Sequence, residues 1–439
     1  MKDATPRSWF GVCAAMFAIA WGGNEFTPLL VFYKHEYEMS GPTVDVLLFA
    51  YVLGMIPALL IGGPLSDRYG RRPLMRPAAF IAAAGSLVLA VATDGVFLLA
   101  IGRILGGIAI GLAMAVGTSW LKELSSPPYS YAGVGSGAKR AAMSLTAGFG
   151  IGAGTAGVLA EWGPWPHAFS YVLNAAICLV GAAWVWNVPE TKPKAELDNG
   201  PETKPKAELD HLPETKPRTA GARSGLLSDL KIPSAGHARF LLVVVPLAPW
   251  VFGAAIGCQA ILPSLIAPEV DAAPMAFAAL ISVVTLSCGF AIQTVARRID
   301  RPDSARAGQV ALTLLILGMG TAAAASALLT IWAVLLAAVV LGAGYGIALV
   351  AGLSEVQRIA GPGDLAGLTA VYYALTYLGF AVPATLAYLH EYIPAVTYPW
   401  MFGFGAVAAA ATLLFVTRSA RRHPSGAPAT PDPAMSARL

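Results

Sequence analysis

The sequence predicts an all-α protein that crosses a membrane many times. Apolar residue types make up 56% of the 439 residues, whereas charged types make up only 12%. This charged share is about half of the ~25% usual in soluble globular domains. The apolar residues are also grouped in blocks that are long enough to cross ~30 Å of hydrocarbon as helices. Together these observations exclude a soluble fold.

Twelve apolar blocks of this kind follow one another, six on each side of a central polar segment. The first six blocks cover residues 9–33, 45–66, 74–93, 97–121, 141–161 and 165–187. The other six cover residues 238–262, 272–296, 308–330, 332–354, 365–389 and 393–417. An even number of spans places both termini on the same side of the membrane.

Lysine and arginine lie almost entirely on one side of this arrangement. Apart from Lys34 and Arg103, every basic residue falls in a terminus or in a loop on the side of the termini. Loops rich in these residues remain in the cytoplasm. We therefore expect a multi-pass protein of the cell membrane with both termini cytoplasmic. The first block follows Lys2 and Arg7 but is too long for a secretion signal, so it should remain as the first span.

The central polar segment contains a 12-residue repeat. PETKPKAELDNG begins at Pro189, PETKPKAELDHL at Pro201 and PETKPRTA at Pro213. Recurring proline and mixed charge favour a disordered tether between two halves, with a docking site for a partner as the alternative. The expected organisation is an N-terminal six-helix bundle over residues 1–187, a cytoplasmic linker over 188–237, a C-terminal six-helix bundle over 238–417 and a disordered cytoplasmic tail over 418–439.

The patterns of cysteine, histidine and charge give no support to a soluble enzyme. The four cysteines lie in apolar blocks without a CxxC pair, and no HExxH, phosphate-binding loop or GxSxG elbow occurs. A formal net charge of +4 without a basic face is too small for nucleic-acid binding. We expect no enzymatic activity, no metal site, no cofactor and no nucleic-acid partner, and a monomer surrounded by lipid.

A family signature lies between the second and third blocks. The chain there reads Gly63-Pro64-Leu65-Ser66-Asp67-Arg68-Tyr69-Gly70-Arg71-Arg72-Pro73-Leu74-Met75. This stretch resembles the GxLxDRxGRRxxL signature of the major facilitator superfamily, and it departs clearly only at Met75, where leucine is usual. The resemblance implies two six-helix bundles around a central cavity, which move a small-molecule substrate by alternating access.

The signature also implies a contact between the two halves. The glycines Gly63 and Gly70 allow a tight turn, and the charged residues are Asp67, Arg68, Arg71 and Arg72. In the family, the acid that matches Asp67 faces the start of span 11, which here is the sequence 361–365. Helix N–H groups favour an anion at that place. We therefore expect an intracellular latch between the halves.

Glu25 is, of the 25 acidic residues, the one that lies well inside an apolar block. A carboxylate at that depth is costly, so it should be paired, face a wet cavity or take up a proton. Arg103 is the basic residue within a span and its expected partner. The stretch 103–107 resembles the RxxxG pattern of span 4 in the same superfamily. In the family's proton-coupled exporters, an acid in span 1 and an arginine in span 4 work near each other. A static buried pair that fixes helix packing is the alternative.

The fifth block carries a run of glycines. Gly148, Gly152 and Gly157 match a degraded form of the GxxxGPxxGG motif of antiporters, with Ala153 in place of its proline and Ala156 in place of a glycine. Small residues at this spacing also allow close helix packing in lipid, which is the alternative interpretation.

Several polar or aromatic residues within the spans are candidates for the substrate cavity. Helical spacing places Trp21 near the face of Glu25. When Pro28 is registered with Pro263, a neutral residue lies opposite Glu25. Aromatic residues with one carboxylate suit amphipathic, weakly polar or cationic molecules better than sugars. The candidates are Trp21, Asn24, Asn174, Trp250, Gln259, Tyr345, Tyr372, Tyr373 and Tyr377.

The sequence therefore predicts a secondary active transporter that exports small amphipathic compounds in exchange for protons, with the proton as the coupling ion. One alternative is a proton symporter or facilitator that takes up a small metabolite, which the missing proline at Ala153 favours. A further alternative is a membrane receptor or scaffold without transport, in which the 12-residue repeat binds a partner.

Overall fold

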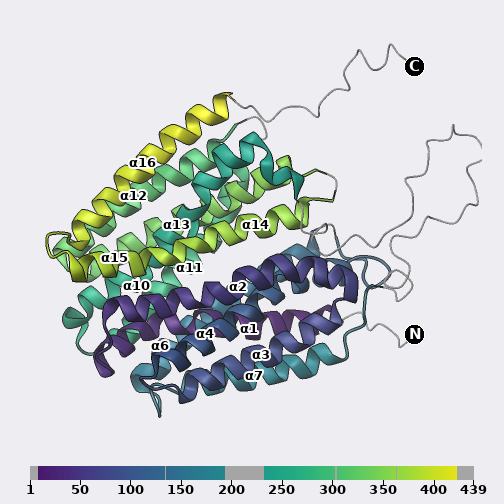
Figure 1. The fold of residues 1–439 in the computed structure, drawn as a ribbon, viewed down its shortest axis with the longest axis horizontal. Coiled ribbons are helices and arrows are strands. Elements are labelled where there is room, and N and C mark those ends of the chain that lie inside the picture. Colours follow the sequence, from purple (N-terminus) through teal and green to yellow (C-terminus); the bar gives the residue numbers. More distant parts are fainter. Residues whose placement is uncertain (1–7, 134, 193–231, 302–303, 362, 423–439) are drawn as a thin grey trace, which may run out of the picture.

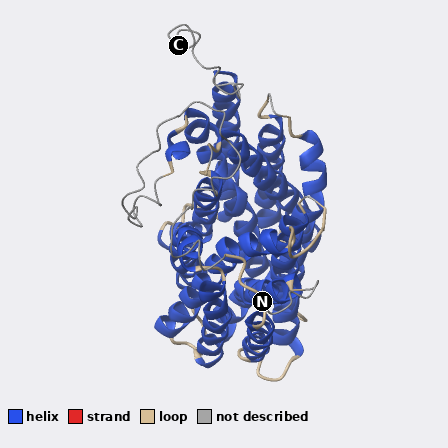
Figure 2. Cartoon of the chain, turned by 90° about the vertical axis from the view of Figure 1, so that its right-hand side faces the viewer, coloured by secondary structure: helices blue, strands red, loops and turns tan. Residues whose placement is uncertain are grey.

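The computed structural model describes residues 8–133, 135–192, 232–301, 304–361 and 363–422. Within these ranges the regular secondary structure is helical, and no strand is present (Figure 2). The 12-residue repeat beyond residue 192 and the tail beyond residue 422 lie outside the described residues. The predictions of a disordered tether and a disordered tail therefore stay predictions.

Six spans form the first half of the chain. α4 continues through a π-helix into α5 as one span. The helices are α1 (Trp9–Glu36), α2 (Gly41–Tyr69), α3 (Arg72–Val91), α4 (Val96–Leu112) with η1 (Ala113–Gly117) and α5 (Thr118–Leu124), α6 (Ser136–Trp162) and α7 (Phe169–Trp186).

Six further spans form the second half. The helices are η2 (Pro233–Gly236), η3 (Phe240–Val244), α10 (Val245–Ile266), η4 (Ala267–Val270), α11 (Pro274–Ile299), α12 (Arg306–Leu328), α13 (Ile331–Ile359), α14 (Leu365–Tyr377) with η5 (Leu378–Phe380) and α15 (Ala381–Tyr392), and α16 (Tyr398–Arg422). The two halves lie beside each other, purple to blue and teal to yellow (Figure 1). The expected fold of two six-helix bundles is thereby confirmed.

Eleven helical spans among the described residues are long and apolar enough to cross a membrane. α1 is the twelfth span of the bundle. Its 28 residues could cross a bilayer, and Asn24 and Glu25 interrupt their apolar run. Most of α1 is buried, including both of these residues. The polar residues at the centre of α1 therefore lie inside the protein and not against lipid.

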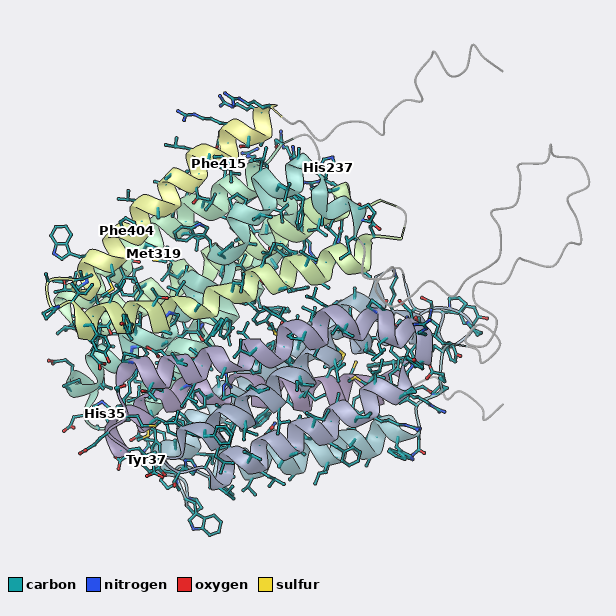
Figure 3. The ribbon with its side chains drawn as sticks, viewed as in Figure 1. His35, Tyr37, His237, Met319, Phe404 and Phe415 are labelled. Carbon is teal, nitrogen blue, oxygen red and sulfur yellow. The ribbon has the colours of Figure 1, made fainter. Side chains whose placement is uncertain are left out.

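The outer surfaces of the bundles are apolar. Along α16, the side chains of Phe404 and Phe415 point away from the other helices (Figure 3), with 74% and 46% of their surface exposed. Exposed apolar surface on this scale is unfavourable in water but not in hydrocarbon. This surface is therefore suited to contact with lipid chains.

The turn between α2 and α3 explains the glycine of the signature. Gly70 ends α2 with a φ of +96°, a conformation that side chains other than glycine rarely adopt. The chain then begins α3 at Arg72. We call the end of the bundle that carries residues 63–72 the signature end, and the end that carries the turn between α1 and α2 the far end.

The two halves meet tightly at the far end. Val31 of α1, Ala267 of η4 and Ala278 of α11 form one buried apolar cluster. The side chain of Ala387 in α15 approaches Gly41 at the start of α2. These contacts close the far end between the halves.

Candidate transport site

Glu25 lies inside the first half. Its side chain is fully buried, and its Oε1 accepts a 2.7 Å hydrogen bond from the indole Nε1–H of Trp21, one helical turn earlier. Its second oxygen, Oε2, has no hydrogen-bond partner among the described residues. The helix thus supplies the carboxyl group with a single donor, because positions four residues apart lie on one face.

Arg103 of α4 is also buried, but its partners are not acidic. Its guanidinium donates to the main-chain oxygens of Leu47 and Leu48, each at 3.3 Å. The Cζ atom lies 4.6 Å from the ring centres of Phe26 and Tyr51. The geometry is that of a cation held by carbonyl groups and ring faces.

The expected ion pair between Glu25 and Arg103 is therefore wrong for this conformation. No ion pair between the two is present in the described part of the chain. Trp21 occupies one carboxylate oxygen, and α2 carbonyls with two aromatic rings surround the guanidinium. The two residues therefore belong to separate sets of contacts within the first half.

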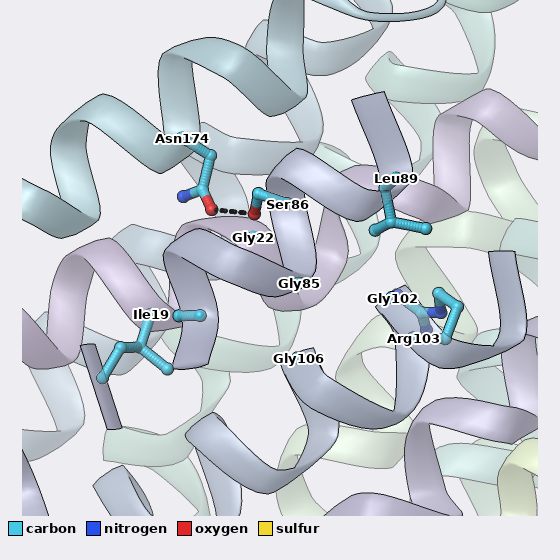
Figure 4. A pocket seen from close by; sticks show the side chains of 10 residues that line it. Ile19, Gly22, Gly85, Ser86, Leu89, Gly102, Arg103, Gly106 and Asn174 are labelled. Atoms are coloured by element: carbon cyan, nitrogen blue, oxygen red, sulfur yellow. Dashed lines mark hydrogen bonds between the residues drawn. The ribbon is translucent and has the colours of Figure 1, made fainter. Parts of the chain in front are cut away.

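A small cavity lies within the first half, between α1, α3, α4 and α7 (Figure 4). Arg103 is in its wall. Asn174, a predicted substrate contact, accepts a 2.7 Å hydrogen bond from Ser86 and donates at 2.9 Å to the Ala18 oxygen. Asn174 therefore joins three helices of one bundle. The cavity residues are Ile19, Gly22, Ala82, Gly85, Ser86, Leu89, Gly102, Arg103, Gly106 and Asn174.

Aromatic residues gather where the second half faces the first. The ring of Phe252 lies 4.5 Å from that of Tyr377 and 5.9 Å from that of Tyr345. Tyr377 packs within the core of the first half, and Tyr373 packs against it. Phe252, which was not among the expected cavity residues, is the centre of this cluster. Its side chain is apolar, so the sequence does not distinguish Phe252 from other core residues. Its position between the two halves identifies it as part of the cluster.

Two other expected cavity residues are engaged within the second half. Trp250 donates a 3.2 Å hydrogen bond to Thr412 of α16. The hydroxyl of Tyr372 donates to the Ala348 oxygen of α13 at 3.2 Å. Both side chains join helices of the same bundle, which is the helix-packing alternative for such residues.

Asn24 and Gln259 retain unused hydrogen-bonding groups. Asn24 Oδ1 accepts a 2.9 Å bond from Thr27, and Gln259 Nε2 donates at 3.3 Å to the Ala255 oxygen. The remaining atoms, Asn24 Nδ2 and Gln259 Oε1, are buried without a partner among the described residues. Asn24 lies four residues before Pro28, and Gln259 lies four residues before Pro263. The corresponding helices α1 and α10 thus hold one free donor and one free acceptor.

The signature does not form the expected contact between the halves. Asp67 pairs with Arg71 at 2.9 Å and with Lys192 at 3.3 Å, and Arg71 pairs with Glu123 at 2.7 Å. Burial works against the charge of Arg71, but Glu123 and Asp67 outweigh it, so its pKa is raised. In this conformation the partners of Asp67 are Arg71 and Lys192, and neither belongs to α14.

The start of α14 has a different partner from the one expected. Asp364 accepts hydrogen bonds from the hydroxyl of Ser234 at 2.6 Å and from its N–H at 2.9 Å. These bonds hold the pKa of Asp364 below its usual value. The prediction that Asp67 occupies this place is therefore wrong for this conformation.

The start of the linker binds the signature turn. Glu190 accepts hydrogen bonds from the N–H groups of Arg71 at 3.0 Å and Arg72 at 2.9 Å. These groups belong to the first turn of α3, where an anion is favoured. Glu190 belongs to the first copy of the repeat. It lies 119 positions from Arg71 in the sequence, so the sequence alone could not show this contact.

Glu25 is not the only acid buried in the helices. Asp45 in α2 is fully buried, 3.6 Å from Lys34, and Glu355 in α13 is bound by Arg239 at 2.6 Å. Both stand near the ends of apolar blocks, so hydropathy alone did not show their burial.

The glycines of α6 allow this helix to pack closely against two other helices, α1 and α11. A Cβ atom on Gly148 or Gly152 would lie 2.5 Å from the Phe17 oxygen or 2.3 Å from the Trp21 oxygen of α1. A Cβ atom on Gly157 would lie 2.3 Å from the Cβ of Ala279 in α11. The first two glycines pack α6 within its half, whereas the third packs it against the other half.

This arrangement of two six-helix bundles with buried charges in the spans is that of a membrane transporter. Residues 9–382 match the family described as the Major Facilitator Superfamily, and the chain belongs to that superfamily.

The similar proteins are transporters of small molecules. The arabinose-proton symporter of Bacillus subtilis is 32% identical over 96 residues, which are 22% of this chain and 20% of the symporter. The glucose transporter GlcP of Staphylococcus epidermidis is 31% identical over 100 residues, 23% of this chain and 22% of GlcP. These matches thus span about a fifth of the relatives. The partially occluded inward-open xylose transporter XylE of E. coli has a TM-score of 0.63 at 16% identity, over 95% of this chain and 98% of XylE.

Proposed function

We propose that this protein imports a small, uncharged, hydroxyl-bearing solute together with a proton, by alternating access of a site between its two halves. The names of the relatives, a sugar-proton symporter and a glucose transporter, support uptake. They do not support the exporter of amphipathic compounds that the sequence predicted. The alternative of a symporter or facilitator is therefore preferred.

The observation that carries proton coupling is the environment of Glu25. The carboxyl group is fully buried, has one hydrogen bond and keeps one oxygen without a partner among the described residues. An isolated carboxylate in such surroundings is costly, and taking up a proton removes that cost.

The solute class rests on Asn24, Gln259 and the aromatic cluster. One free donor and one free acceptor suit a hydroxyl group, which can accept and donate at once. The rings of Phe252, Tyr345 and Tyr377 would cover an apolar face of the solute. Neither group supplies a charge, so a neutral solute fits best.

The orientation and surroundings follow the sequence-based expectation. We propose that the signature end is cytoplasmic, that the protein works as a monomer in the cell membrane, and that the proton is its coupling ion. The closed far end would then be the outer side.

Transport by liposomes containing the purified protein tests this function. With an inward proton gradient, we expect accumulation of L-arabinose, D-glucose or D-xylose, and alkalinisation of the medium when the solute is added. Acidification on addition of solute would indicate antiport instead. Movement of none of these solutes, or movement only of a charged compound such as 4-hydroxybenzoate, would contradict the proposed solute class.

Glu25→Gln tests the coupling group. We expect this variant to lose accumulation against a gradient but to keep exchange of solute between the two sides, because its side chain cannot titrate. Glu36→Gln, which removes a charge at the exposed end of α1, is the matched control. Proton-driven accumulation that is equal in wild type and Glu25→Gln would remove Glu25 from the mechanism. Equal movement in both without any effect of the proton gradient would identify a facilitator.

A further inference from the structure

Glu161 joins the two halves at the far end. It is the penultimate residue of α6, and its Oε2 accepts hydrogen bonds from the N–H groups of Met275 at 2.8 Å and Ala276 at 3.2 Å. Both N–H groups belong to the first turn of α11 in the other half. The residue before α11, Ala273, has no side chain that could cap this turn.

The chemistry of this contact favours the ionised carboxylate. The first N–H groups of a helix have no partner within the helix, and the helix dipole places partial positive charge there. Glu161 therefore replaces the missing cap of α11 from another part of the chain. The contact exists only while the ends of α6 and α11 remain together.

The helices below this contact are packed closely. A Cβ atom on Gly157 would lie 2.3 Å from the Cβ of Ala279 and 2.6 Å from the Met275 oxygen, and one on Gly154 would lie 3.2 Å from Val283. The carboxylate thus stands at the far-end limit of a continuous seam between α6 and α11. Opening the far end requires this seam to separate.

We propose that Glu161 is a releasable latch of the far end. Its carboxylate, bound to the first turn of α11, stabilises the form that is closed there and so sets the balance between this form and the form open at the far end. When the ends of α6 and α11 separate, water reaches the carboxylate and the two N–H groups. Hydrogen bonds to water then replace the hydrogen bonds between Glu161 and α11. The role in a transport cycle rests on the proposed function, whereas the contact and its effect on the two forms do not.

Distances between spin labels at the far end test the latch without any solute. Labels on cysteines introduced at the exposed positions Thr93 and Thr330 report on the two halves, in a background without the native cysteines. We expect Glu161→Ala to raise the long-distance population by about 2- to 5-fold, the effect of losing one charge–dipole contact. The long-distance population of Glu161→Gln should lie between those of wild type and Glu161→Ala, because the amide oxygen still accepts hydrogen bonds but has no charge.

Glu36→Gln is the control for loss of one far-end acidic charge, and its distances should equal those of wild type. A distribution of label distances in Glu161→Ala that matches those of wild type and Glu36→Gln would overturn the latch. If Glu161→Ala does not fold, Glu161→Gln and Gly157→Ala still report on the same seam, and unchanged distances in both would reject the proposal. A shift in distances without transport of any solute would sustain the latch and reject the proposed function. Transport of a solute together with unchanged distances would support the proposed function and reject the latch.

Discussion

The indole N–H of Trp21 donates a 2.7 Å hydrogen bond to the carboxyl group of Glu25, one turn further along α1. Both side chains are buried, so this bond is made away from water. A buried group that loses its partner keeps its full cost of desolvation. The pair therefore links the stability of α1 in the bundle to the group that we propose for proton coupling.

Removal of this donor should destabilise the protein. We expect Trp21→Phe to lower the free energy of unfolding by about 1–3 kcal/mol, the cost of leaving a buried acceptor unsatisfied. The same substitution in a Glu25→Leu background should cost clearly less, because no carboxyl group then needs the donor. Thermal unfolding in detergent of the two single variants and the double variant measures the difference. Equal costs in both backgrounds would show that the bond contributes nothing.

Glu190 should stabilise the turn between α2 and α3. Its carboxylate accepts from the N–H groups of Arg71 and Arg72, as an N-cap side chain does. We expect Glu190→Gln to lower the free energy of unfolding by about 0.5–2 kcal/mol. The repeat supplies a matched control, since Glu202 occupies the same place in the second copy of PETKPKAELD. A Glu202→Gln variant that is destabilised as much would show that position 190 has no special role.

Two glycines of α6 should respond differently to alanine. A Cβ atom on Gly157 would collide with α11, whereas one on Gly150 would meet no atom within 4 Å. We expect Gly157→Ala to separate the halves at the far end, with a longer distance between labels at Thr93 and Thr330 and slower transport. Gly150→Ala should resemble wild type in both measurements. Equal behaviour of the two variants would contradict the close approach at Gly157.

His167 should make stability depend on pH. Its ring lies at the far end among Tyr37, Tyr33 and Tyr171, with ring centres 5.7, 5.9 and 6.1 Å away. Burial lowers its pKa from the usual value of 6.5. The unfolded chain therefore binds the proton more readily, so folded stability is lost as the pH falls through 6.5 towards the lower folded value.

We expect the melting temperature of wild type to fall between pH 7 and pH 5 by more than that of a His167→Phe variant. A His35→Gln variant, which changes an exposed histidine near the same end, should keep the wild-type dependence. An identical pH dependence in wild type and His167→Phe would assign the loss of stability to other groups.

The transmembrane organisation could be predicted from the sequence because hydropathy and chain length are local properties. The block that begins at Trp9 became α1, and the signature turn lies between α2 and α3. The glycine at position 70 follows from the positive φ that this turn requires. Hydropathy could not show the burial of Asp45 and Glu355, because both stand near the ends of apolar blocks.

The partners of the charged residues could not be predicted in the same way. The sequence predicts Arg103 as the partner of Glu25, but the hydrogen-bond donor is Trp21 on the same helix. The signature predicts that Asp67 faces the start of span 11, but its partners are Arg71 and Lys192. Ser234 binds Asp364 at the start of span 11 instead. Each assignment followed from a matching motif, which specifies the type of a residue but not the conformation of the bundle.

The sequence by itself determined which segments cross the membrane, which end carries the basic loops and to which superfamily the signature belongs. These properties depend on the composition of short segments and on their order. Only the tertiary structure decided that Trp21 satisfies Glu25, that Glu190 caps α3 and that Glu161 binds the first turn of α11. The last two contacts join residues more than a hundred positions apart, so they depend on how the helices pack.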